Sequence, residues 1–69
     1  MSALITEPNL ADFDAVYQRW IDAHSGLPDL ASQRLNARLV LILFNHLGDE
    51  TLIGDALSLA VSTAESEQA

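Results

Sequence analysis

The side chains able to carry out chemistry are few, and most of them lie within residues 46–50. His46, Asp49 and Glu50 provide one imidazole and two carboxylates in this short segment. Such a group can bind a divalent cation or exchange protons with a substrate. A structural role accounts for the same residues, because the helix dipole favours a histidine at a helix C-terminus and acids at the start of the next helix. We expect the structural role and keep a metal- or small-ligand-binding site at these three residues as the alternative.

Other catalytic arrangements are missing from the sequence. There is no cysteine, which excludes thiolate nucleophiles, disulfides and thiolate zinc sites. The three glycines are scattered along the chain and form no phosphate-binding loop. The other histidine, His24, is separated from His46 by a helix, about 25 Å at the usual helical rise. The sequence therefore predicts a protein that is not an enzyme and has no cofactor.

A second group of polar and apolar residues indicates contact with another protein. Arg34 and Arg38 are one helical turn apart and can hold a carboxylate or a phosphate between them, although such a pair is more often solvated or engaged in ordinary surface ion pairs. Leu41 and Asn45 continue the same ridge, and Leu59 lies on the outward side of a later helix. Two leucines on outward faces of so small a domain indicate a contact surface. We predict an interface made by these five residues.

Hydrophobic periodicity predicts three helices, at about residues 10–24, 28–47 and 50–64. A lead, residues 1–8, precedes them, and residues 65–69 form a frayed tail. Both connections are short, which makes consecutive helices antiparallel neighbours. The predicted fold is all-α: three antiparallel helices in an up-down-up arrangement, forming a single domain over residues 1–69 and packed as an oligomer.

Turn and capping residues set the predicted helix boundaries. Asn9 is the expected N-cap of the first helix, because its side chain can accept from the backbone N–H three residues later. Pro28 suits the first position of the second helix. Gly26 and Gly48 are expected to end the first and second helices, since glycine adopts the left-handed conformation at little cost. Gly54 lies inside the third helix, where it is most simply tolerated.

Apolar side chains follow one face of the first helix and most of the circumference of the second. We expect the aromatic residues Phe13, Tyr17 and Trp20 to lie in the core, and the second helix to be buried on several sides as the centre of the fold. Asn36, at the edge of the apolar arc, is expected to hydrogen-bond to another helix. A further alternative is a pocket for an apolar ligand between the helices, lined by Trp20 and Phe44.

Composition limits the classes of partner. The 69 residues contain ten acids and three arginines, for a net charge of −7. We expect neither nucleic acids nor anionic membranes as partners of such a chain. No apolar run approaches the ~20 residues of a membrane span, and no signal-type segment is present, so we expect a cytoplasmic protein. The central segment, residues 31–48, contains two arginines and no acid, whereas residues 49–69 contain five acids and no base.

Two segments resemble a known family of small bacterial proteins. Residues 35–49, with the pair Asn36 and Arg38 and the ending from Asn45 to Asp49, are similar to the family called domain of unknown function 2783. Residues 4–12 are similar to it as well, although Phe44 stands where a smaller residue is expected. The resemblance implies no catalytic residues, because the family has no settled activity. It implies a candidate partner, since its members accompany flavin-dependent aromatic hydroxylases in bacterial gene clusters.

Taken with the apolar central helix and the small core, these features predict a non-catalytic helical interaction module. We expect it to self-associate, to act as a small accessory subunit of a larger enzyme such as a flavin-dependent aromatic hydroxylase, or to do both.

Overall fold

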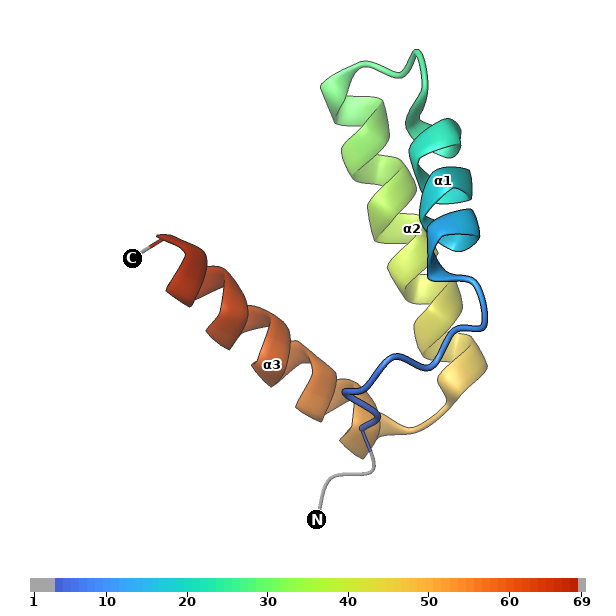
Figure 1. Ribbon diagram of the computed structural model, residues 1–69. Helices are drawn as coiled ribbons and strands as arrows, with labels where there is room; N and C mark the ends of the chain where they lie inside the picture. The colour runs from blue at the N-terminus through green and yellow to red at the C-terminus, as the bar shows by residue number, and fades with distance from the viewer. Residues whose placement is uncertain (1–3, 69) are drawn as a thin grey trace.

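The protein is built from three α-helices. The structure, a computed structural model, describes residues 4–68, with side chains up to Glu67. The helices are α1 (Phe13–His24), α2 (Asp29–Leu47) and α3 (Glu50–Gln68), and no strand occurs in the described residues (Figure 1). The all-α prediction is therefore confirmed. None of these helices is sufficiently long and apolar to cross a bilayer, within the part of the chain that is described.

Helix α1 begins three residues later than predicted. Its N-cap is Asp12, whose carboxylate accepts from the Ala15 N–H over 3.0 Å. The prediction of Asn9 as the cap was wrong, because the acid three residues later satisfies the first turn of the helix. The predicted end is correct: the helix stops at His24, and Gly26 follows with a positive φ of 78°.

The boundaries of α2 agree closely with the prediction. Pro28 is the N-cap rather than the first helical residue, and it provides no side-chain hydrogen bond. At the other end Gly48 adopts the left-handed conformation, φ 62°, and its N–H donates to the Phe44 carbonyl over 3.0 Å. This geometry is the usual C-terminal stop that glycine allows.

Helix α3 is longer than predicted. The Asp49 carboxylate accepts from the Leu52 N–H over 3.0 Å, so this acid caps the helix. The helix then continues to Gln68, four residues past the predicted end at Ala64. Residues 65–68, expected as a tail beyond the helix, are helical in the structure, and they contain no glycine or proline to stop the helix. Ala69 lies outside the described residues.

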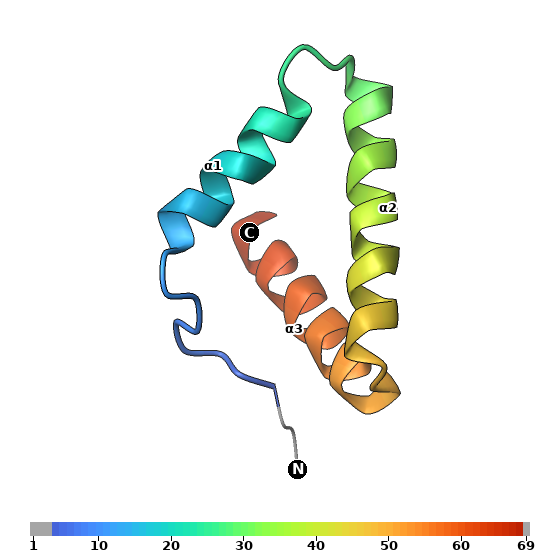
Figure 2. The ribbon, with the colours of Figure 1, turned by 90° about the vertical axis from the view of Figure 1, so that its right-hand side faces the viewer.

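The helices diverge from one another. Helices α1 and α2 run in opposite directions from their short connection and separate away from it, as Figure 2 shows. Helix α3 turns away from the end of α2 instead of running back along it (Figure 1). Three helices are thus confirmed, but a closely packed antiparallel bundle is not. The Gly48–Asp49 connection directs α3 outward, and the apolar faces of the three helices are left without close neighbours.

The N-terminal lead lies at the junction between α2 and α3. It crosses from the start of α1 to the beginning of α3 (Figure 1). Leu4 and Ile5 line a common cavity with Phe44 of α2 and with Leu52 and Ile53 of α3. The lead therefore lies beside the end of α2 and the base of α3.

No side chain in residues 4–67 is buried, and this contradicts two predictions. Helix α2 was expected to be buried on several sides, but its Ile42 is 65% exposed. The aromatic stripe of α1 was expected in the core, but Phe13 is 62% and Trp20 is 39% exposed. Both errors have the same cause: the periodicity identifies the apolar faces correctly, but a single chain offers no surface to cover them.

The dimensions of the chain agree with this lack of a core. The accessible surface is 6153 Å², whereas the scaling for compact monomers gives about 4,250 Å² at this mass. The Cα radius of gyration is 13.9 Å, against about 11 Å for a compact domain of this length. The chain thus exposes roughly 1,900 Å² more than a compact monomer of its mass.

Candidate functional site

A polar group joins α1 to α2 near their connection. The Trp20 indole N–H donates to Asn36 Oδ1 over 3.1 Å, and His24 Nε2 lies 2.9 Å from the same oxygen. His24 Nδ1 lies 2.7 Å from the Trp20 carbonyl. The prediction that Asn36 bonds to another helix is confirmed. The role of His24 was missed, although its position one turn after Trp20 on the same face could have indicated it.

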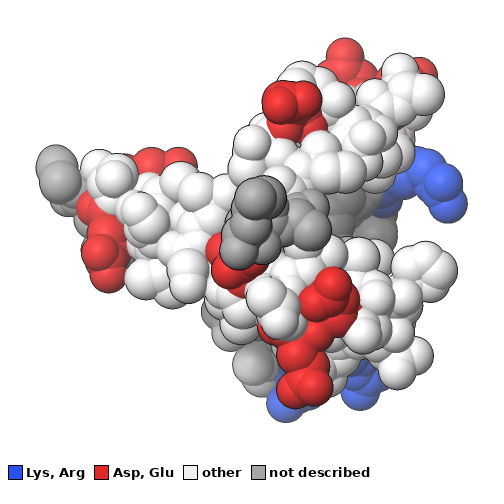
Figure 3. All heavy atoms as spheres, turned by 90° about the horizontal axis from the view of Figure 1, so that it is seen from below, with Lys and Arg blue, Asp and Glu red and all other residues white. Residues whose placement is uncertain are grey.

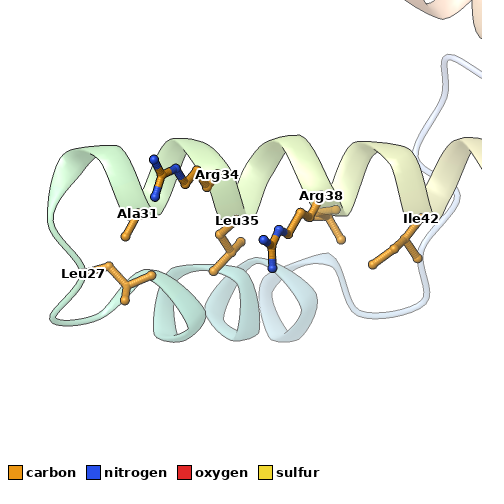
Figure 4. A pocket seen from close by; sticks show the side chains of 7 residues that line it. Leu27, Ala31, Arg34, Leu35, Arg38 and Ile42 are labelled. Atoms are coloured by element: carbon orange, nitrogen blue, oxygen red, sulfur yellow. The ribbon is translucent and has the colours of Figure 1, made fainter.

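Beside this link, α2 and the α1–α2 connection form an open apolar groove. We call it the docking groove; its lining residues are Leu27, Ala31, Arg34, Leu35, Arg38, Leu39 and Ile42. In Figure 4, Leu35 and Ile42 extend from α2 toward the side of α1, and the Arg38 guanidinium lies beside Leu35. The lining of the groove is therefore aliphatic, and the guanidinium groups of Arg34 and Arg38 lie at its edge.

Neither arginine of the docking groove makes an ion pair within the described residues. Arg34 and Arg38 are also exposed. Intramolecular ion pairs are therefore not formed there, whereas a pair of solvated surface arginines agrees with this exposure. Two exposed guanidinium groups beside an apolar surface have the chemistry to bind carboxylates or phosphates.

The structure brings together four of the five predicted interface residues. Arg34, Arg38, Leu41 and Asn45 lie on α2 at spacings of four, three and four, which places them along one side of the helix. Leu41 is 64% exposed and borders the docking groove without lining it. Leu59 lies on α3, which diverges from α2, so it belongs to a different surface.

Helix α3 presents a second exposed apolar surface and carries only acids. Leu57 and Val61 are 52% and 56% exposed. Its charged residues are Glu50, Asp55, Glu65 and Glu67. Figure 3 shows acidic and no basic side chains on the visible face of the arm that α3 forms.

The alternative metal site is not supported by the geometry. No group of three or more histidine and acidic side chains in the described residues is placed to hold a metal ion, and this includes His46, Asp49 and Glu50. Asp49 instead caps α3 and Glu50 occupies its first turn, as the structural interpretation predicted. The apolar-ligand alternative is not supported either, because Trp20 does not line the cavity that contains Phe44.

Comparison with known proteins agrees with the resemblance noted from the sequence. No curated protein and no solved structure matches the chain. The family described as "Protein of unknown function (DUF2783)" matches residues 4–62, which is most of the 69-residue chain. The chain therefore belongs to this family of proteins of unknown function.

Proposed function

We propose that this protein is a non-catalytic interaction module that completes its hydrophobic core against another protein surface. The observation that carries the proposal is the absence of any buried side chain in residues 4–67 of a chain that is 49% hydrophobic. Apolar surface of this extent is stabilising only when it is removed from water. A chain of this length has little other means of stabilisation, since it has no cysteine to form disulfides.

The docking groove and the ridge beside it are the contact surface on α2. Arg34 and Arg38 provide directed charge, Leu41 adds apolar area, and Asn45 adds a polar rim. A groove of this kind accepts an amphipathic helix, whose apolar face fills the floor while its acids meet the arginines. Free arginines at the edge of an apolar surface are also typical of residues that contribute strongly to binding.

Two occupants are compatible with this function. One is a second copy of the chain. The other is a larger enzyme, and the family resemblance indicates a flavin-dependent aromatic hydroxylase, for which this protein would be an accessory subunit. The first has support in the complementary charges of α2 and α3, and the second rests on the resemblance alone.

Unfolding as a function of protein concentration tests the function. Trp20 is the only tryptophan, so its fluorescence reports on α1 without labelling. If association completes the core, the midpoint of thermal unfolding rises with protein concentration, or rises on addition of the partner enzyme. A single cooperative transition whose midpoint is the same at every concentration, and is unaffected by the enzyme, would contradict the proposal.

A further inference from the structure

We infer that the occupant of the docking groove is α3 of a second copy, and that two chains exchange these helices reciprocally to form a symmetric dimer. The inference rests on the proposed function and names its partner.

The charges of α2 and α3 are complementary. The groove bears Arg34 and Arg38, neither of which has an ion-pair partner in the described residues. Helix α3 bears acids and no base. Its exposed outer half ends in Glu65 and Glu67, both exposed. A second copy therefore brings the acids that the groove lacks.

The apolar side chains of the two surfaces have the same spacing. Leu35, Leu39 and Ile42 of the groove are separated by four and then three residues, and so are Leu57, Val61 and Ala64 of α3. Alternating spacings of three and four allow side chains of facing helices to interlock. With the helices antiparallel, Ala64 lies near Leu35 and Leu57 near Ile42. This direction places Glu65 beside Arg34 and within reach of Arg38, which fixes the register.

The available area suits a stable dimer. Each chain exposes about 1,900 Å² more than a compact monomer of its mass. Two chains together can bury about 3,800 Å², which is in the range of about 2,000–5,000 Å² for obligate homodimers. Reciprocal exchange uses the same pair of surfaces twice, as two-fold symmetry requires. The outward direction of α3 in Figure 1 leaves its outer half free to enter this arrangement.

Charge reversal in full-length protein tests the inference. The variant Arg34→Glu/Arg38→Glu and the variant Glu65→Arg/Glu67→Arg each place like charges at both copies of the interface. We expect either double variant to raise the dimer Kd about a hundredfold, because like charges facing each other across an interface are strongly unfavourable. Sedimentation equilibrium measures Kd, and circular dichroism verifies that the helices persist.

Mixing the two double variants tests whether the docking groove of one copy contacts α3 of the other. In the mixed dimer each reversed surface meets an opposite charge, so the equimolar mixture should dimerise with a Kd within about tenfold of the wild type. A single chain that carries all four substitutions retains the net charge of −7 and should dimerise by itself. The matched controls are Arg19→Glu, on the outer side of α1, and Asp55→Arg, on the side of α3 away from Leu57. Each control should leave the Kd within threefold of the wild-type value.

The outcomes separate this inference from the proposed function. The exchange of α3 would be overturned if neither double variant changed the Kd of the dimer. It would also be overturned if the mixture of the two variants remained monomeric. Neither result would contradict the proposed interaction function. A wild-type monomer that unfolds cooperatively only with a partner enzyme would also overturn the exchange alone. A wild-type monomer with cooperative unfolding at all concentrations would overturn both.

Discussion

The side chains of Trp20 and Asn36 are joined by a hydrogen bond of 3.1 Å, and this bond ties α1 to the middle of α2. The same amide oxygen lies 2.9 Å from His24 Nε2, so one residue of α2 holds two residues of α1. Because α1 and α2 separate beyond this point, the link determines where the two helices meet. It thereby positions the α1–α2 connection, which contributes Leu27 to the docking groove.

Asn36→Ala should therefore destabilise the protein. Removal of the amide leaves the Trp20 N–H and the His24 ring without their shared partner, and we expect a loss of about 1 kcal/mol in the free energy of unfolding. Gln33→Ala is the matched control, because Gln33 is exposed on the same helix, does not line the docking groove, and makes no side-chain hydrogen bond within the described residues. The control should cost less than about 0.5 kcal/mol, since alanine is the better helix former. Urea unfolding followed by Trp20 fluorescence measures both; equal losses would refute a specific role for Asn36.

The helix caps provide a second prediction. Asp12→Ala and Asp49→Ala each remove a carboxylate that accepts a backbone N–H, and each should cost about 1 kcal/mol of stability. Asn9→Ala should cost little, because α1 begins after Asp12. Circular dichroism during urea unfolding compares the three variants. A loss for Asn9→Ala as large as that for Asp12→Ala would mean that the helix starts earlier than the structure shows.

Two glycines should respond to alanine in opposite directions. Gly48 has a φ of 62°, where a Cβ is strained, so Gly48→Ala should destabilise by about 1 kcal/mol. Gly54 lies inside α3 with open space around a Cβ, so Gly54→Ala should stabilise the helix by about 0.5–1 kcal/mol. Thermal unfolding at one fixed concentration compares them. A destabilising Gly54→Ala would instead indicate that a neighbouring backbone approaches this position in the assembled protein.

Leu41 tests the part of the surface that borders the docking groove. Leu41→Asp places a charge on the 64% exposed ridge of α2, so association should weaken at least about tenfold while helical content is retained. Leu59→Asp is the control on α3: at about 100° per residue, Leu59 lies on the opposite side of that helix from Leu57 and Val61. Light scattering gives the mass of each variant. Full assembly of Leu41→Asp would exclude the ridge from the interface.

Local signals in the sequence predicted the helices well, and the arrangement of the helices could not be predicted from them. Gly26 and Gly48 ended the helices as expected, since their conformations depend on adjacent residues. The apolar stripe of α1 was identified, but whether Trp20 is buried depends on what lies opposite. Periodicity assumes that each apolar face has a partner in the same chain. The direction of α3 breaks this assumption.

The same distinction applies to the candidate site. Arg34 and Arg38 were identified because their spacing on a helix is a local property. Leu27 was missed, because it lines the groove only through the turn between α1 and α2. The separation of Leu59 from the other interface residues depends on how α3 leaves α2, which no local pattern specifies.

The most direct test of the central claim is the solution mass of the wild-type protein by light scattering, from about 1 μM to about 1 mM, which brackets Kd values for weak to moderately tight association. Completion of the core by a second copy of the chain predicts a mass near twice 7.5 kDa over the upper part of this range. The opposite result is a mass of 7.5 kDa at every concentration together with cooperative unfolding. That result would mean that the single chain closes its own core, and it would contradict the account.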